Sequence, residues 1–339
     1  MKETNLLSCN ESDLETAAML LKKGEVVALP TETVYGLAAD ALNSEAVAEI
    51  FNAKGRPADN PLIIHISDLE MMKRYTEDIP NAAYRLADKF WPGPLTMVLP
   101  KRSIVPEIVT GGLDTVGVRM PENEIMRKVI SMVGRPLAAP SANRSGSPSP
   151  TTAAHVADDM NGRVSAIVDG GECSVGVEST VISFEGYDTI RILRPGLITA
   201  EQLRKVVDEV IIDSNILSDT VPEVKEVRSP GMKYKHYSPE AHVVLVRENL
   251  SEFIRYVSAQ PEENLCCLIF DQDAENFPFE YMTYGATPEE QARQIFSKLR
   301  EADKRGIKNL YVRAPRKEGV GLAVYNRLIR AAGYEVVES

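Results

Sequence analysis

Short apolar runs alternate with amphipathic segments along the first 200 residues of the chain. Such runs are typical of buried strands, whereas apolar residues spaced by three or four positions are typical of helices. The predicted strands are residues 25–29, 62–66, 95–99, 115–119, 166–169, 180–184 and 190–194. The predicted helices are residues 44–54, 82–90, 123–132 and 151–160. Because strands and helices interleave, we expect an α/β domain with a twisted, mixed sheet.

Two further helices are predicted from capping signals. Ser12-Asp13-Leu14-Glu15 has the sequence of a capping box, and Gly24 suits the end of the helix that it would open. Thr199 and Gln202 have the same spacing before a second helix. Residues 31–36 are mostly polar and are predicted to form a loop after the first strand. A loop at a strand end is a plausible place for a small ligand.

The last hundred residues carry a strand–helix pattern three times. The predicted strands are residues 243–246, 266–270 and 310–312, and the helices that follow them are residues 250–258, 288–302 and 323–332. This order is typical of a small parallel sheet with crossover helices. We therefore expect a smaller, Rossmann-like α/β domain, although the sequence contains neither GxGxxG nor a Walker loop.

A linker is predicted between the two domains. Residues 213–240 have few periodic apolar positions, and Lys233, Tyr234 and Lys235 form a basic, aromatic stretch within them. Ordinary linkers are rich in glycine, serine or proline and lack aromatic residues. The stretch is therefore predicted to contact a ligand, as a lid would. The predicted boundaries are residues 1–212 for the first domain, 213–240 for the linker and 241–339 for the second domain.

Composition and charge exclude several classes of protein. The 339 residues are 44% hydrophobic and 26% charged, and the formal net charge of −11 argues against a general binder of nucleic acid or anionic membranes. The sequence has no run of 18 apolar residues and no signal-peptide core at its start. No CxxC pair occurs, so neither a zinc site nor a disulfide framework is predicted. We expect a reduced, cytoplasmic protein.

Two cations at the end of a predicted helix are the first candidates for chemistry. Lys54 and Arg56 flank a glycine, and His65 lies on the strand that follows. Cations at a helix C-terminus commonly complement the helix dipole, and a lone histidine on a strand is usually a core residue. Together the three side chains could instead line a pocket for an anion. These residues alone leave both interpretations open.

A loop rich in hydroxyl and amide groups is the second candidate. Residues 139–151 include Ser141 and Ser149 and lead into a predicted helix N-terminus, a favourable place for an anion. The same composition is typical of a flexible surface loop. Arg119 and Arg194 each end a predicted strand, where an arginine is most often structural. Taken singly, none of these motifs identifies a site.

The order of the motifs along the chain is more specific than any one of them. They are Pro30-Thr31-Glu32-Thr33-Val34-Tyr35-Gly36-Leu37, Lys54-Gly55-Arg56-Pro57, Asn60-Pro61-Leu62, Trp91-Pro92-Gly93-Pro94-Leu95-Thr96, Arg119-Met120-Pro121, Pro140-Ser141-Ala142-Asn143 and Arg194-Pro195-Gly196. This series closely resembles the YrdC-like family over about residues 10–205. Residues 229–239 and the added α/β domain resemble its long, two-domain branch, the L-threonylcarbamoyladenylate synthases.

The resemblance implies an activity and a set of partners. Enzymes of this family use L-threonine, bicarbonate or CO2, and ATP, and they form threonylcarbamoyl-AMP and pyrophosphate. A separate transferase complex then moves the threonylcarbamoyl group to adenosine in certain tRNAs, and direct tRNA binding by this chain is left open. Mg²⁺ is expected with ATP, held mostly by phosphate and water. The reaction needs positioning and charge neutralisation but no protein nucleophile.

The resemblance also implies roles for individual residues. Lys54 and Arg56 would neutralise phosphate charge in the catalytic step. The residues expected to contact ATP are Arg56, Asn60, Thr115, Ser141, Ser149, Arg194 and Tyr234. The residues expected to contact L-threonine are Thr33, His65, Arg119, Ala139 and Ser179. Asn143 would orient its loop, and no residue is expected to ligate a metal.

Three other functions are compatible with parts of the sequence. The first domain could hold RNA in a local basic groove without catalysis, although its overall charge is negative. A carbamoyl transferase of hydrogenase maturation would carry zinc-finger-like modules, and the chain has no CxxC pair. The C-terminal domain could have a regulatory role, or could support the lid or a partner.

Overall fold

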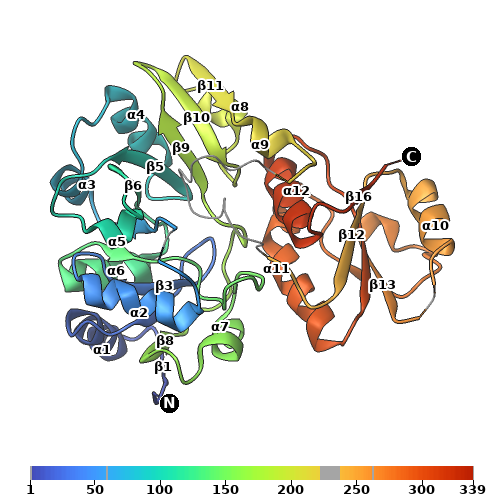
Figure 1. The fold of residues 1–339 in the computed structure, drawn as a ribbon, viewed down its shortest axis with the longest axis horizontal. Coiled ribbons are helices and arrows are strands. Elements are labelled where there is room, and N and C mark those ends of the chain that lie inside the picture. The colour runs from blue at the N-terminus through green and yellow to red at the C-terminus, as the bar shows by residue number, and fades with distance from the viewer. Residues whose placement is uncertain (1, 59, 222–236, 262, 339) are drawn as a thin grey trace.

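Two β-sheets organise the chain in the computed structural model (Figure 1). The structure describes residues 2–58, 60–221, 237–261 and 263–338. Within these ranges the larger sheet has 11 strands in the order β1-β8-β2-β3-β7-β4-β6-β5-β9-β10-β11, and the smaller has 5 in the order β14-β13-β15-β12-β16. The larger sheet mixes parallel and antiparallel pairs, whereas the pairs described in the smaller sheet are parallel. The expected fold class is confirmed.

The larger sheet belongs to the N-terminal part of the chain. Its strands are β1 (Asn5–Leu7), β2 (Val27–Leu29), β3 (Gly36–Asp40), β4 (Ile63–His65), β5 (Leu95–Pro100), β6 (Thr115–Arg119), β7 (Leu137–Ala138), β8 (Ala166–Val168), β9 (Thr180–Phe184), β10 (Thr189–Arg194) and β11 (Glu209–Ile212). Its helices are α1 (Glu11–Lys22), α2 (Ser44–Lys54), α3 (Leu69–Tyr75), α4 (Asn81–Phe90), α5 (Glu107–Thr110), α6 (Glu124–Val133), α7 (Ala153–Met160), α8 (Ala200–Leu203) and α9 (Ser214–Leu217). Every strand and helix predicted by range in this part agrees with one of these elements to within two residues.

The predicted start of α1 is wrong. The N-cap is Asn10, whose side chain accepts a hydrogen bond from the Asp13 backbone N–H, so Ser12 already lies inside the helix. Asp13 is itself held by the backbone N–H and the hydroxyl of Ser8, which draws the chain into the helix earlier than the capping-box pattern predicts. The capping box of Thr199 and Gln202 at the start of α8 is confirmed.

Strand β3 is absent from the sequence-based prediction. Its residues are Gly-Leu-Ala-Ala-Asp, and glycine, alanine and aspartate are poor strand formers. The strand forms because all five residues are buried and pair antiparallel with β2 on one side and β7 on the other. The predicted loop therefore ends before Gly36. Periodicity also misses the short elements β1, α3, α5, β11 and α9.

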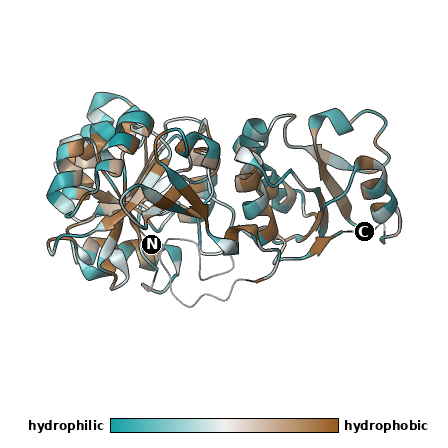
Figure 2. Ribbon diagram, turned by 90° about the horizontal axis from the view of Figure 1, so that it is seen from above, coloured by the Kyte–Doolittle hydropathy of each residue, from teal (hydrophilic) through white to brown (hydrophobic). Residues whose placement is uncertain are grey.

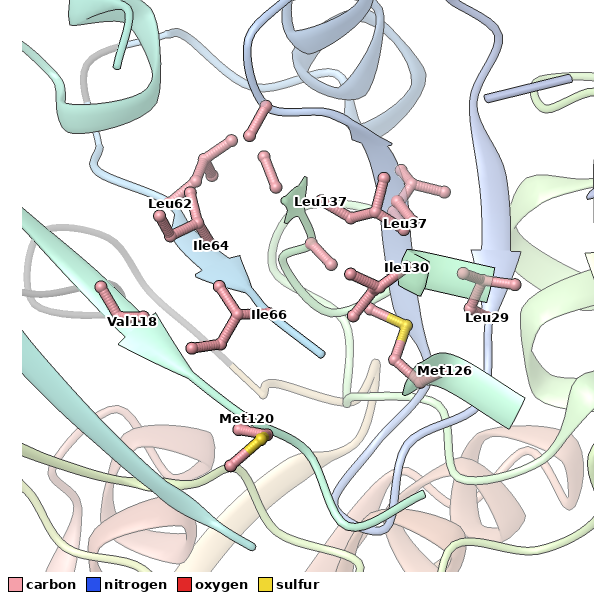
Figure 3. Close-up of a cluster of buried hydrophobic side chains, with 14 of the residues drawn as sticks. Leu29, Leu37, Leu62, Ile64, Ile66, Val118, Met120, Met126, Ile130 and Leu137 are labelled. Atoms are coloured by element: carbon pink, nitrogen blue, oxygen red, sulfur yellow. The ribbon is translucent and has the colours of Figure 1, made fainter. Parts of the chain in front are cut away.

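Apolar side chains at the centre of the larger sheet pack against α6 (Figure 3). Leu37 of β3 and Leu137 of β7 lie close to Met126 and Ile130 of the helix. Ile64 continues the cluster onto β4. Figure 2 shows the same division over the whole chain, with hydrophobic strands inside and hydrophilic helix faces outside. This packing fixes the ends of the central strands, where polar residues gather.

Helices cover both faces of the smaller sheet. Its strands are β12 (His242–Val246), β13 (Leu265–Ile269), β14 (Tyr281–Thr283), β15 (Asn309–Arg313) and β16 (Val336–Val337). Its helices are α10 (Leu250–Ser258), the 3-10 turn η1 (Asp271–Asp273), α11 (Pro288–Lys304) and α12 (Gly319–Ala331). Phe253 of α10 packs with Val244 on one face, and Phe296 of α11 and Leu328 of α12 pack with Leu245 on the other. Periodicity predicts the three larger helices and the three central strands but misses β14 and β16.

Helices α11 and α12 lie between the smaller sheet and the N-terminal domain (Figure 1). The apolar cluster on this side of the sheet includes Val34 and Val177 of the N-terminal domain. Arg300 of α11 forms a buried ion pair with Asp159, with 2.7 Å between Nη2 and Oδ2. The two domains therefore share a packed interface. No helix in the described ranges is both long and apolar enough to cross a membrane.

Replacing Gly176 with alanine should weaken this interface. Gly176 has φ +82°, and a Cβ atom there would lie 2.4 Å from the Cα of Arg293 in α11. Gly171 has φ +80° but no described atom within 4 Å of such a Cβ, so Gly171→Ala is a matched control. We expect Gly171→Ala to lower the free energy of unfolding by about 1–2 kcal/mol, and Gly176→Ala by about 2 kcal/mol more, because it also overpacks the interface. Denaturant unfolding measures both, and equal losses would contradict the packing argument.

Candidate functional site

Loops and strand ends of the N-terminal domain, together with Tyr237, line a cavity. It lies between the loop before β3, the end of α2, strand β4, the ends of β6 and β10, and the loops after β7 and before β9. Its polar and charged lining residues are Thr31, Thr33, Lys54, Arg56, His65, Arg119, Ser141, Asn143, Ser145, Glu178, Ser179, Arg194 and Tyr237. Four of them are cations and one is a carboxylate, which suits an anionic ligand.

Lys54 ties α2 to the loop after β7. The helix ends at Lys54 because Gly55 adopts the left-handed C-cap conformation, with φ 64°. The buried Nζ donates to the carbonyl oxygens of Ser141, at 2.5 Å, and Asn143, at 2.8 Å. Burial, and then the charge of Arg56, lower the pKa of Lys54 to about 7. An anion that bound beside this amine would raise its pKa again.

Asn143 organises the same loop through its side chain. Its Oδ1 accepts a hydrogen bond from the Ser141 hydroxyl at 2.6 Å. Its Nδ2 donates to the carbonyl oxygens of Arg144 and Ser147, each at 2.8 Å. These contacts agree with the predicted role of Asn143 in orienting the loop.

Arg119 is held at the end of β6 by a buried ion pair. Its Nη2 lies 2.7 Å from Oε1 of Glu32, and both side chains are at most 4% exposed. Its Nη1 donates to the Thr33 hydroxyl at 2.9 Å, and its Nε donates to the Gly93 carbonyl at 3.3 Å. An arginine has five N–H donors, so donors remain for a carboxylate ligand.

Three buried side-chain atoms of Asn60 and His65 lack hydrogen-bond partners within the described residues. Both amide atoms of Asn60 and the Nδ1 atom of His65 are buried without a hydrogen bond to any described residue. Burial, and then the charge of Arg119, lower the pKa of His65 to about 3, so the ring is neutral at physiological pH. Buried polar atoms are nearly always paired, and a ligand in the cavity could supply the missing partners.

Ser179 and Arg194 form the wall opposite Lys54. Arg194 donates from Nε to the Ser179 carbonyl at 3.0 Å and from Nη2 to the Ser179 hydroxyl at 3.1 Å. The hydroxyls of Ser179 and Thr96 are 2.8 Å apart. Arg194 is thus fixed by the residue just before β9, and its charge borders the cavity.

Glu178 connects the cavity wall to the C-terminal domain. Its Oε1 accepts a hydrogen bond from Ser149 at 2.6 Å, and its Oε2 accepts one from Nε of Arg327 in α12 at 3.0 Å. The side chain of Arg327 is fully buried and also donates to the carbonyl of Pro195 at 2.6 Å. Burial alone would raise the pKa of Glu178, but the charges of Arg327 and Arg194 outweigh it and lower that pKa. The carboxylate therefore stays ionised in the wall.

The arrangement offers charge and hydrogen bonds rather than a nucleophile. No group of three or more His, Cys, Asp or Glu side chains within the described ranges is placed to hold a metal ion. Burial raises the pKa of the Cys173 thiol to about 12, so this cysteine is not a thiolate. The site is suited to binding and orienting anions that react with one another.

Comparisons with known proteins match both domains. A sequence family described as "Telomere recombination" matches residues 19–196, and one described as "Threonylcarbamoyl-AMP synthase, C-terminal domain" matches residues 198–333. The threonylcarbamoyl-AMP synthase of Pyrococcus abyssi is 45% identical, with 97% of this chain and 96% of that protein covered. The Bacillus subtilis threonylcarbamoyl-AMP synthase is 41% identical, with 98% and 97% covered. The chain belongs to the threonylcarbamoyl-AMP synthase family.

A solved structure agrees with this membership. The crystal structure of P. abyssi Sua5 complexed with L-threonine matches with a TM-score of 0.91 and 43% sequence identity, and the match covers 98% of this chain and 99% of that one. The two-domain arrangement is thus shared with a threonylcarbamoyl-AMP synthase relative over nearly the whole length. The YrdC-like resemblance predicted from the motif order is confirmed.

Most of the residues predicted from the family resemblance line the cavity. They are Thr33, Lys54, Arg56, His65, Arg119, Ala139, Ser141, Asn143, Ser179 and Arg194. The fold thus brings residues from both ends of the first 200 positions to one place. Which ligand atom each residue of the synthase contacts stays a prediction.

Two predicted nucleotide contacts lie next to the cavity rather than on its lining. Asn60 precedes Pro61, which does line the cavity, and its side chain is fully buried. Ser149 is also fully buried and reaches the wall only through its hydrogen bond to Glu178. In this structure Ser149 supports the wall.

The structure does not bring Thr115 into the cavity lining. Thr115 begins β6 and pairs with Pro100, whereas the cavity lies at the other end of the strand, beside Arg119. The spacing of a motif along a strand cannot tell which end faces a ligand. Tyr234, Lys233 and Lys235 lie outside the described residues, so their predicted contacts and the lid have no structural account here.

Sequence reasoning assigned no role to three residues that shape the site. Glu32 lies in the motif of residues 30–37 and Glu178 lies just before β9, and the available signal for each was a carboxylate in a polar turn near a motif arginine. Arg327 sits in the middle of an amphipathic helix in the other domain, and no local signal marks it. Only the folded chain shows that these residues meet at the synthase cavity.

Removing the positive charge of Arg327 should leave Glu178 buried without that partner. We expect Arg327→Met to lower the free energy of unfolding by about 3–5 kcal/mol, because breaking a buried ion pair leaves an uncompensated charge. Glu178→Gln combined with Arg327→Met should recover part of that loss. Urea unfolding of the two variants checks this, and a double variant no more stable than Arg327→Met would argue against the ion pair as the cause.

Proposed function

We propose that this chain forms threonylcarbamoyl-AMP and pyrophosphate from L-threonine, bicarbonate or CO2, and ATP. The observation that carries the proposal is that Arg119, Lys54 and Arg56 line one cavity, where an arginine could pair with a carboxylate and the other two cations could meet phosphate charge. The similarity to threonylcarbamoyl-AMP synthases along nearly the whole chain supports it. The RNA-binding alternative receives no comparable support.

The reaction can proceed without a covalent intermediate on the protein. The threonine amine and bicarbonate give a carbamate and water, or the amine and CO2 give a carbamate and a proton. A carbamate oxygen then attacks the α-phosphorus of ATP, and the bond to the β,γ-phosphates breaks as pyrophosphate leaves. The protein must hold the three reactants together and balance the charge that develops.

The threonine would bind on the side of β4 and β6. Arg119, held by Glu32, would pair with the threonine carboxylate through its remaining donors. The neutral His65 could accept a hydrogen bond from the ammonium or hydroxyl group through Nδ1. The relative named as a complex with L-threonine is consistent with an amino-acid site in this fold.

The triphosphate would bind on the side of α2 and the loop after β7. Lys54 and Arg56 would meet its charge there, and the amide of Asn60 would gain a partner. Mg²⁺ would accompany the ATP. Because Glu32 and Glu178 are each committed to an arginine, phosphate oxygens and water would hold the ion.

The product is a mixed anhydride that water would destroy. Exclusion of water from the cavity would protect it until transfer. We propose that a threonylcarbamoyl transferase complex takes the product and passes the group to tRNA, so this chain supplies an activated intermediate rather than the final modification.

Pyrophosphate release from ATP, with L-threonine and bicarbonate each present or omitted, tests the proposed reaction. We expect release only when both are present. Arg119→Lys should raise the KM for threonine by about tenfold or more, because one ammonium cannot reproduce a bidentate contact, and should change the KM for ATP little. Arg127→Lys on α6 is the control. Pyrophosphate release that needs neither L-threonine nor bicarbonate would contradict the proposal.

The low pKa of Lys54 predicts a pH effect on ATP binding. Its folded-state pKa of about 7 means that the free amine is mostly neutral above pH 7. A bound triphosphate favours the charged form, so ATP binding should take up a proton between about pH 7 and 9, and affinity should fall as pH rises through that range. Titration calorimetry in buffers of different ionisation heats measures the uptake. In Lys54→Met the proton uptake should vanish, and uptake that persists would mean that a group other than Lys54 takes up the proton.

A further inference from the structure

A second crevice, of about 930 Å³, lies at the carboxyl ends of the strands in the C-terminal domain. Residues that follow β12, β13 and β15 line it, together with the first turns of α11 and α12. The chain leaves β12 for α10 on one face of the sheet and leaves the adjacent β15 for α12 on the other face (Figure 1). Adjacent parallel strands whose connections leave on opposite faces open a crevice in which α/β proteins bind ligands.

The lining of this crevice carries more cations than acids. The cations are Arg247, Arg313, Arg316 and Lys317, and the acids are Glu248 and Glu318. Behind the lining, Asp219 pairs with Lys317 and Arg247, Glu338 pairs with Arg247, and Asp273 pairs with Arg313. Those pairs hold three of the cations in place. The fourth, Arg316, has a side chain that is 91% exposed and lies 3.6 Å from Glu318.

The N-terminus of α12 opens onto the crevice. The helix has 13 residues and begins at Gly319, after an N-cap residue, Glu318, whose side chain makes no capping hydrogen bond. Gly321 in the first turn lines the crevice. First-turn N–H groups and the helix dipole attract phosphate oxygens.

A buried amide gives an independent indication of a ligand. Gln291 of α11 lines the crevice and is only 5% exposed, and its side-chain amide makes no hydrogen bond within the described ranges. What remains accessible of the amide faces the crevice rather than a sealed interior, so a ligand bound there could supply its partner. Phe270 borders the same crevice, with the Arg313 guanidinium 5.1 Å from its ring centroid.

We propose that this crevice binds a nucleoside monophosphate. Its phosphate would lie against the N–H groups at the start of α12, with charge from Arg316 and Lys317. Gln291 would pair with a polar edge of the base, and Phe270 would border the ring. The crevice is large enough for a ligand of this size. The site lies apart from the cavity of the N-terminal domain and does not depend on the reaction proposed there.

Equilibrium dialysis of the full chain against AMP tests this site. Arg316→Glu reverses an exposed charge, and Gln291→Leu removes the amide without breaking a side-chain hydrogen bond seen in the described residues. Arg255→Glu on α10 is the matched control, because Arg255 is also exposed and pairs with a glutamate of its own helix. We expect each crevice variant to bind AMP at this site about tenfold or more weakly, and the control to bind like the parent. Unfolding temperature and pyrophosphate release should stay at parental values in all three.

Inorganic phosphate is the second probe in the same experiment. AMP should bind the crevice at least about tenfold more tightly than phosphate, because the base adds contacts. Unchanged AMP binding in both crevice variants would overturn the site, and phosphate that binds as tightly as AMP would overturn the nucleotide assignment. A parent chain that releases no pyrophosphate would count against the synthase reaction and leave the crevice result intact.

Discussion

The buried carboxylate of Glu178 is the charge on which the assembly of this molecule depends. It lies in the wall of the N-terminal cavity, yet the guanidinium that neutralises it belongs to α12 of the other domain. An unpaired carboxylate at this depth would cost several kcal/mol. The N-terminal cavity therefore reaches its low-energy form only when the C-terminal domain is docked. This ion pair, together with the one between Arg300 and Asp159, therefore links docking of the C-terminal domain to the form of the cavity wall.

The other charges around the cavity divide into fixed and adjustable groups. Arg119 is locked by Glu32 and Thr33, and Arg194 by Ser179, so these guanidiniums present charge in a set direction. Lys54 is different, because its protonation responds to its surroundings near neutral pH. Fixed arginines provide geometry without reorganisation during reaction, while the lysine matches its charge to whatever anion lies beside it.

Local pattern predicts much of this fold, and most of the site residues implied by the order of the motifs line the cavity. Periodicity finds α2, β6 and α10 to the residue, because their propensity and burial agree. It misses β3, whose glycine and alanines become a strand only between two partners. The family resemblance places Thr115 in the site, although the cavity lies at the other end of that strand, and neither resemblance nor periodicity selects Arg327. Contacts between distant segments decide these cases, and such contacts leave no trace in local spacing.

Helix α12 places two chemically distinct regions on one rigid element. Gly321 in its first turn lines the C-terminal crevice, and Arg327 forms an ion pair with Glu178 farther along the same helix. Six residues of α-helix span about 9 Å. A helix this short moves as a rod, so a displacement at its first turn would carry the guanidinium with it and shift the cavity wall. Helix α12 therefore couples the position of its first turn at the crevice to the position of the Glu178 carboxylate.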